Sequence, residues 1–237
     1  MHVIAVASQK GGSGKTTLAG HIAVEADRRG AGPVALVDTD PQRSLSEWWN
    51  VRTAQTPLFA RTAAARLAVD AERMRDLGVK LLVIDTPPAI EAMIAEVIRL
   101  ADLVVIPARP SPHDLRAAGA TVGLVEDAGK PLVFVINGAT PRARITSEAA
   151  IALSQHGTLA PAILHHRTAY AASMIDGRTV MEVPGEPRAA AEIALLWDYL
   201  SGRLHKDRRI LFPAHHLPAA VAAIPEANRL VAAGERP

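Results

Sequence analysis

A glycine-rich loop near the start of the chain constrains the fold more than any other stretch of the sequence. It lies between the apolar run 3–7 and a helical pattern that begins at Leu18, and it consists of Gln9, Lys10, Gly11, Gly12, Ser13, Gly14, Lys15, Thr16 and Thr17. Glycines leave backbone N–H groups unshielded and a helix N-terminus carries partial positive charge, so a loop between a strand and a helix suits a polyphosphate. We therefore expect a phosphate loop in which Lys15 contacts the β and γ oxygens and the Thr16 hydroxyl contacts Mg²⁺.

The first positions of this loop differ from the usual phosphate-loop pattern. That pattern has a glycine six positions before its lysine, whereas this chain has Gln9 there and a second lysine, Lys10, directly after it. The string K-G-G-x-G-K-T-T resembles the deviant Walker A motif of the ParA/MinD family of ATPases. The resemblance implies that ATP and Mg²⁺ are the cofactors, that Lys10 and Lys15 are catalytic, and that Lys10 reaches across a nucleotide-sandwich dimer to the partner's phosphates.

Apolar runs separated by helical patterns predict the architecture. A possible short strand at 58–59 accompanies longer runs at 3–7, 33–38, 80–85, 102–107, 132–136 and 159–164. Because these runs lack the alternation of half-exposed strands, they indicate a doubly wound α/β fold, a mostly parallel sheet with helices on both faces. In such a sheet ligands bind at the carboxyl ends of the strands, where both the phosphate loop and Asp38 fall. Helical patterns between the runs cover 16–29, 64–77, 90–100, 115–125, 168–175 and 187–204.

Two aspartates end the run at 33–38. The string Asp38-Thr39-Asp40-Pro41-Gln42 keeps both carboxylates at the sheet edge, because proline stops the strand. Two acids beside a triphosphate repel it unless a metal or a water proton lies between, and a contact between carboxylate and water is sufficient for in-line phosphoryl transfer. The string matches the family's D-x-D-P-Q motif. The resemblance implies that Asp40 positions the attacking water and that Asp38 helps to hold the hydrated Mg²⁺.

Two further polar residues end neighbouring runs. Asp85 precedes T-P-P, which is a Walker B pattern, and beside a phosphate loop it is the expected outer-sphere ligand of Mg²⁺. The family's D-x-P-P form agrees. Asn137 follows the run at 132–136, and its amide offers the donor and acceptor that the adenine N6/N7 edge requires. The family places adenine near here, although a turn-forming Asn before Gly138 explains the residue equally well.

A proline-rich loop and several basic residues carry the remaining functional signals. The loop 108–114, stiffened by Pro110 and Pro112, looks like the segment that lies at the dimer face in short plasmid-type ParA proteins. The resemblance also implies nonspecific DNA binding through scattered basic residues, for which the candidates are Arg142, Arg144, Arg167, Arg178 and Arg188. Such contacts neutralise phosphates and carry no sequence information. Each arginine is also explained as a solvated surface charge, and Arg142 and Arg144 are expected in an exposed loop.

Composition excludes several classes of site. The chain has no cysteine, which rules out disulfides, thiolate metal sites and an iron–sulfur reductase, and its net charge of +2 does not by itself argue for DNA. His165 and His166 are adjacent, so they face opposite sides of a strand, and no acid lies near them in the sequence. We expect no metal there. Without a run of about 18 apolar residues, the protein is expected to be soluble. The lack of cysteine suits a reducing cytoplasm, where we expect the protein, and the resemblance implies association with the nucleoid.

The organisation predicted is one ATPase domain over 1–204 and a C-terminal extension of unknown role over 205–237. The leading functional hypothesis is a ParA-type ATPase that dimerises with ATP, binds DNA nonspecifically and is activated by a ParB-like or cargo-adaptor protein. Its role would be to segregate a plasmid or chromosome or to position a large cargo. One alternative is a MinD-like membrane-associated ATPase, although the alanine-rich 221–237 segment has few basic residues for membrane binding. The other is an ATP-dependent ligase, for which no acceptor-substrate pocket stands out.

Overall fold

A computed structural model describes residues 1–206, and a seven-stranded sheet forms its centre. The strand order is β3-β2-β4-β1-β5-β6-β7, and every pair of neighbours is parallel. The predicted parallel α/β architecture is therefore confirmed, including the short strand β3. The strands are β1 (His2–Val6), β2 (Val34–Asp38), β3 (Leu58–Phe59), β4 (Leu81–Asp85), β5 (Leu103–Ala108), β6 (Leu132–Ala139) and β7 (Thr158–His165).

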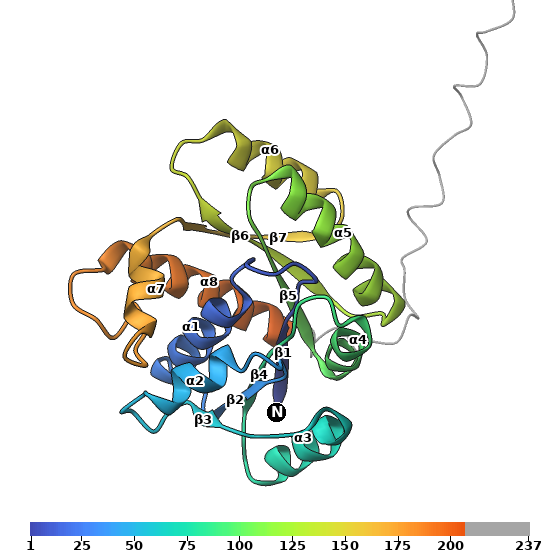
Figure 1. The fold of residues 1–237 in the computed structure, drawn as a ribbon, viewed down its shortest axis with the longest axis vertical. Helices are drawn as coiled ribbons and strands as arrows, with labels where there is room; N and C mark the ends of the chain where they lie inside the picture. Colours follow the sequence, from blue (N-terminus) through green and yellow to red (C-terminus); the bar gives the residue numbers. More distant parts are fainter. Residues whose placement is uncertain (207–237) are drawn as a thin grey trace, which may run out of the picture.

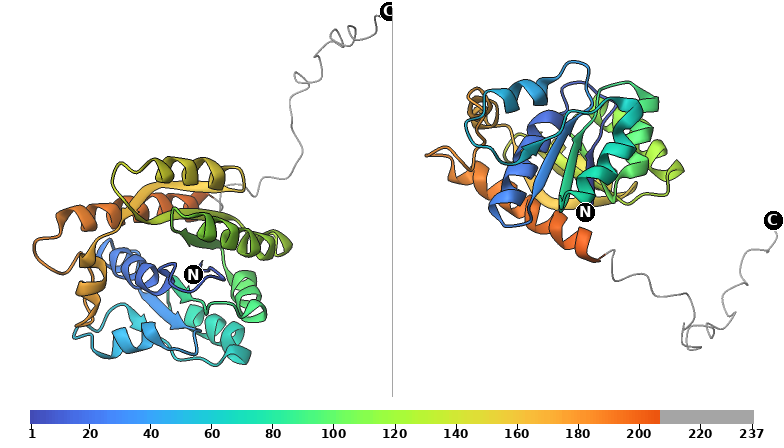
Figure 2. Two further views of the ribbon diagram at one scale, coloured as in Figure 1. Left: turned by 45° about the horizontal axis from the view of Figure 1, so that its top comes forward. Right: turned by 90° about the horizontal axis from the view of Figure 1, so that it is seen from below.

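Helices cover both faces of the sheet (Figure 1). Successive strand residues point to opposite faces, so Ile4 packs into one apolar cluster and Ala5 into the other. One cluster contains side chains of α1 (Lys15–Arg28), α2 (Ser44–Asn50), α7 (Thr168–Met174) and α8 (Pro187–Lys206). The other contains side chains of α3 (Leu67–Asp76), α4 (Glu91–Leu100), α5 (Pro112–Asp127) and α6 (Arg144–Ser154). The two layers of helices are visible in the rotated views of Figure 2.

Burial on both faces explains the composition of the central strands. Residues 3–6 of β1 and 81–85 of β4 are buried along their whole length, since each face of the sheet is closed by helices. A strand that is dry on both sides needs apolar side chains at every position, which is why these runs show no alternation.

Two local expectations were wrong. The segment that follows Arg142 is not an exposed loop, because α6 begins at Arg144 and buries Thr146, Ala149 and Leu153 at helical spacing. Small and polar residues on that face hide the apolar periodicity on which the sequence analysis relied. The helix predicted over 64–77 is also divided, with a 3₁₀ turn at Ala64–Arg66 before α3. The other helices differ from prediction mainly at their ends, where boundaries are least determined by sequence.

The topology creates a crevice at one edge of the sheet. From β1 the chain crosses through α1 to β2 on one side, whereas β5 lies on the other side of β1. Because all strands are parallel, the segments that follow β1, β2, β4, β5 and β6 meet at the same carboxyl edge. Within the described residues, no helix combines the length and apolar character that crossing a bilayer requires.

Candidate functional site

The phosphate loop has the geometry of an anion cradle. Gly14 immediately precedes α1, has φ +95°, and leaves the first turn of the helix without a side-chain cap. Gly12 has φ +73°, and a Cβ added at Gly11 or Gly12 would find no atom within 4 Å. Positive φ favours glycine, and open space beside uncapped amides admits phosphate oxygens closely. This part of the chain therefore fits the phosphates of a nucleotide.

Two adjoining cavities open on this loop. A cavity of about 740 Å³ is lined by residues that include Gly11, Gly12, Lys15, Thr16 and Asp40. A smaller one of about 170 Å³ is lined by residues that include Thr17, Asn137, Leu164, His165 and Tyr170. The larger cavity thus collects the groups expected around phosphates, and the smaller one continues toward β6 and β7.

Asn137 is tied to the phosphate loop. Its Nδ2 donates to the carbonyl of Ser13 at 2.7 Å, and a Cβ on Gly14 would lie only 2.2 Å from that nitrogen. Gly138 has φ +69° but lies within β6, where the pairing with β7 shifts register between Asn137 and Ala139, so a bulge stands where the sequence offered a turn. Asn137 therefore couples the end of β6 to the loop, and its contact with adenine stays a prediction.

Lys15, within the phosphate loop, lies near carboxylates from other segments of the chain. Its side chain is buried, and its Nζ donates to the carbonyl of Lys10 at 3.1 Å. Burial lowers the pKa of the Lys15 ammonium, and the charges of Asp85 and Asp40 oppose that shift. A phosphate beside Lys15 would further stabilise the charged form, which matches its predicted role.

Thr16 and Asp85 form the candidate magnesium site. The Thr16 hydroxyl donates to Oδ2 of Asp85 at 2.6 Å, whereas the buried Oδ1 of Asp85 has no hydrogen-bond partner. Burial, with a smaller contribution from the neighbouring charge of Asp38, raises the pKa of Asp85 to about 7 against the opposing effect of the hydrogen bond from Thr16. An orphaned carboxylate oxygen next to a hydroxyl fits a hard cation. Residues 1–206 gather no cluster of three or more His, Cys, Asp or Glu side chains that could hold a metal ion.

Asp38 and Asp40 lie at the end of β2, in register with the end of β4. Asp38 is paired with Asp85 across the two strands. Its carboxylate accepts from the backbone N–H and hydroxyl of Ser46, both at 2.9 Å, and from the backbone N–H of Asp40 at 3.0 Å. Asp38 thus holds the start of α2 in this structure, and its contact with hydrated Mg²⁺ stays a prediction. Asp40 accepts from the backbone N–H of Gln42 at 2.9 Å and lines the larger cavity.

Lys10 contacts an acid of its own subunit. Its Nζ lies 2.5 Å from Oδ2 of Asp114, which also accepts a hydrogen bond from the Ser111 hydroxyl at 2.5 Å. Ser111 caps α5 by accepting from the backbone N–H of Asp114 at 3.2 Å. The sequence analysis missed Asp114 as a partner of Lys10. The only signal was its position at the end of the proline-rich string.

The sequence comparison decides the family. The model of the CobQ/CobB/MinD/ParA nucleotide binding domain matches residues 4–180. The chain belongs to this family. The "Maintenance of carboxysome distribution protein A" of Halothiobacillus neapolitanus is 28% identical over 198 residues, which cover 80% of this chain and 91% of that protein. "Protein ParA" of Rhizobium radiobacter is 31% identical over 128 residues, covering 54% of this chain and 57% of that protein.

The fold agrees with this assignment to the CobQ/CobB/MinD/ParA family. The septum site-determining protein MinD of Pyrococcus horikoshii, solved as a complex with Mg-ADP, superposes with a TM-score of 0.68 at 18% identity. The match covers 86% of this chain and 98% of that one. At this level of identity the likeness shows a shared fold.

The arginines proposed for DNA binding in this family member lie in different settings. Arg144, Arg167 and Arg178 form ion pairs with Glu148, Glu192 and Asp176, respectively, at 2.7, 2.6 and 2.6 Å. Within residues 1–206, Arg142 and Arg188 are exposed and have no ion pair. Pairing reduces the positive charge that the first three would offer to phosphates, so their role in DNA binding stays a prediction.

An acid does lie beside His165, contrary to the sequence expectation. Nδ1 of His165 is 2.8 Å from Oε1 of Glu192, which α8 brings across the end of β7. Arg167 and the Tyr170 hydroxyl also contact Glu192. The carboxylate is therefore already satisfied by three partners, and the absence of a metal at the histidines stays a prediction.

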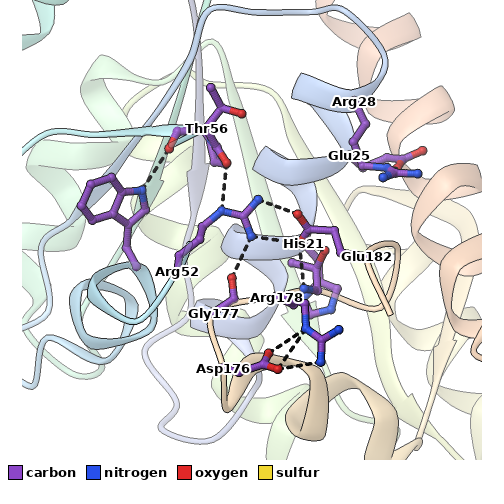
Figure 3. A network of polar contacts seen from close by, with 12 residues as sticks. His21, Glu25, Arg28, Arg52, Thr56, Asp176, Gly177, Arg178 and Glu182 are labelled. Carbon is purple, nitrogen blue, oxygen red and sulfur yellow. Dashed lines mark hydrogen bonds and ion pairs between the residues drawn. The ribbon is translucent and has the colours of Figure 1, made fainter. Parts of the chain in front are cut away.

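A buried arginine connects two segments of the chain near the larger cavity. Figure 3 shows Arg52 directed at Glu182, with Nη2 to Oε1 at 2.6 Å and Nη1 to Oε2 at 2.9 Å. The same Nη1 donates to the carbonyl of Gly177 at 2.7 Å, and a Cβ on Gly177 would lie 2.4 Å from Cα of Arg52. These contacts of Arg52 join the segment after α2 to the segment between α7 and α8. Sequence reasoning missed them because 130 residues separate the partners.

Proposed function

We propose that this CobQ/CobB/MinD/ParA-family protein is a ParA-type ATPase that positions a large cargo or segregates a plasmid or chromosome. The observation that carries the proposal is the convergence of Lys10, Lys15, Thr16, Asp40 and Asp85 around one phosphate loop at the sheet edge. A loop with two lysines and two flanking acids suits hydrolysis of a nucleoside triphosphate. The names of the carboxysome-distribution and ParA relatives support a positioning role.

Each residue of the site has a separate role in the proposed hydrolysis of ATP. Bound ATP supplies the phosphoryl group to be transferred, and Mg²⁺ screens its charge. The amides of residues 11–17 and the Lys15 ammonium bind the phosphates, and Asn137 holds the loop in place. Thr16 and Asp85 hold the cation, with Asp38 alongside. Asp40, held by its hydrogen bond from Gln42, orients the attacking water and accepts its proton.

Dimerisation makes the activity a switch. Lys10 leaves Asp114 and contacts the phosphates bound by a second copy of the chain, so that the ATP-bound state favours a homodimer. The dimer holds DNA nonspecifically on the nucleoid through phosphate contacts, and a ParB-like or cargo-adaptor protein accelerates hydrolysis and release. A nucleotide shifts this equilibrium only by its differential affinity for the two states.

A DNA-binding measurement tests the switch. Binding to a duplex of arbitrary sequence is measured at one stated salt concentration with ATP, with ADP and without nucleotide. We expect the ATP state to bind at least about tenfold more tightly, because a dimer neutralises more phosphates than a monomer. The variant Lys15→Ala should bind equally weakly in all conditions. Equal binding of the wild-type protein in all three states would refute the proposal.

A further inference from the structure

Arg109 stands at the junction of the two cavities. It directly follows β5, and its side chain lines both the larger cavity at the phosphate loop and the smaller one that continues toward β7. Only four of the lining residues are shared by both cavities: Gly14, Thr17, Arg109 and Ala171. If the larger cavity takes phosphates and the smaller one the nucleoside, Arg109 lies where the two halves of a nucleotide meet.

The guanidinium of Arg109 is uncommitted. Its side chain is exposed and, within residues 1–206, makes no hydrogen bond or ion pair. The other ammonium and guanidinium groups that line these cavities already have partners: Lys15 contacts the Lys10 carbonyl, and Arg167 contacts Glu192. A guanidinium presents five donors in a planar fork that matches phosphate oxygens. Among the lysines and arginines of residues 1–206 that line these cavities, Arg109 is therefore the one whose side chain makes no hydrogen bond or ion pair.

The loop positions Arg109, and within residues 1–206 no acid forms an ion pair with its guanidinium. Pro110 restricts the backbone of the residue before it, and the backbone N–H of Ser111 donates to the Arg109 carbonyl at 2.7 Å. The side chain lies across Gly138, where a Cβ would be 3.8 Å from both Cγ and Nε of Arg109. Gly138 in turn adjoins Asn137, which is bonded to the phosphate loop. The aliphatic stem is thus supported beside the loop while the head group faces open space.

We propose that Arg109 binds the phosphate chain of the nucleotide held by its own subunit, at the end nearest the nucleoside. The inference rests on the proposed nucleotide-binding function and adds a third basic group to the two lysines of the loop. A contact within the subunit is favoured because Arg109 lines the cavities of its own chain. The class of ligand is a nucleoside di- or triphosphate, and the recognition is by charge.

The test uses ADP, which carries the phosphates nearest the nucleoside and does not demand the dimer. Affinity is measured by calorimetry with Mg²⁺ at low and high salt for the full-length wild-type protein, Arg109→Gln and Arg109→Lys. We expect Arg109→Gln to weaken ADP binding by about tenfold and to flatten its salt dependence, because a charged hydrogen bond is lost. Arg109→Lys should recover part of the affinity. Unchanged melting of Arg109→Gln without nucleotide would show that the loss is not one of folding.

Arg116→Gln is the matched control. Arg116 is an exposed residue of α5, two positions after Asp114; it lines neither cavity and forms no ion pair within residues 1–206. The Arg116→Gln variant should bind ADP with the affinity of the wild-type protein. Equal ADP affinity of Arg109→Gln and wild type would overturn this inference and leave the proposed function intact. A defect confined to ATP-dependent dimerisation would also overturn it, because the contact of Arg109 would then lie across the dimer interface. Failure of the wild-type protein to bind ADP or ATP would overturn the proposed function as well.

Discussion

The Nζ atom of Lys10 lies 2.5 Å from Oδ2 of Asp114, so the first lysine of the phosphate loop is held by the start of α5 in its own subunit. Asp114 is buried, and the Lys10 ammonium holds the pKa of its carboxyl low together with the Ser111 hydroxyl, against the opposing effect of burial. A lysine in this ion pair cannot also reach another subunit. The contact therefore competes with the proposed dimer.

Asp114→Asn should make the dimer form more readily. The substitution removes the charge that retains Lys10 and keeps the shape of the side chain, so the ion pair no longer has to be broken. Because a partly exposed ion pair contributes about 1 kcal/mol and each of the two subunits breaks one, we expect the dimer dissociation constant with a nonhydrolysable ATP analogue to fall about thirtyfold. Sedimentation measures it. Lys10→Ala and the double variant should both dimerise poorly, and a weaker dimer in Asp114→Asn would mean that the acid is needed in the assembled state.

Asp40→Ala should separate binding from hydrolysis. The variant keeps the phosphate loop and loses the carboxylate that orients water, so ATP hydrolysis should fall on the order of a hundredfold while ATP affinity is retained. Phosphate release and nucleotide binding are measured on the same preparation. The ATP-bound dimer should accumulate. Hydrolysis at the parental rate would show that another group handles the water.

Arg52→Met should destabilise the fold. The substitution leaves Glu182 half-buried without its cation, although the backbone N–H and hydroxyl of Thr179 still donate to it at 2.9 Å. Removing one partner of a buried pair costs about 3 to 5 kcal/mol, and we expect about 2 kcal/mol in urea unfolding because Glu182 is partly exposed and keeps the donors of Thr179. Arg178→Met, which breaks the exposed pair with Asp176, should cost less than about 0.5 kcal/mol. Equal losses would show that burial of the Arg52 pair contributes nothing extra.

His21 should make stability fall on mild acidification. Its ring is fully buried, lies 2.7 Å from the Thr17 carbonyl through Nδ1, and accepts from the backbone N–H of Val180 at 3.3 Å. Burial lowers the pKa of His21 to about 4 from the ordinary histidine value of 6.5. Between these values the unfolded chain binds a proton that the folded chain excludes. The stability is therefore complete above the unfolded pKa and is lost as pH falls toward 4, by up to about 3 kcal/mol.

Urea unfolding at about pH 7 and about pH 5 checks the His21 prediction. His21→Gln should be less stable than the wild type at neutral pH, because its amide replaces a fitted ring. Its loss of stability between the two pH values should nevertheless be smaller, since it cannot bind the proton. The same pH dependence in both proteins would assign the acid sensitivity to other groups.

The fold was predictable where the signal is local. Buried apolar runs identified each strand of residues 1–206, and their lack of alternation identified a parallel sheet covered on both faces. Helix α6 was missed because Thr146 and Ala149 provide little apolar contrast on its buried face. The order of strands in the sheet was not predicted, since apolar runs of similar composition can be arranged in several ways.

The sequence by itself determined the phosphate loop, its glycines and the acids that end β2 and β4, because these depend on residues adjacent in the chain and on the shared edge of parallel strands. Tertiary structure decided which charges meet. Lys10 and Asp114 are 104 residues apart, and Arg52 and Glu182 are 130 apart. Sequence periodicity indicates which face of a helix or strand is buried. Which charged side chains come into contact depends on how the helices and loops pack, and that packing is determined only in the folded chain.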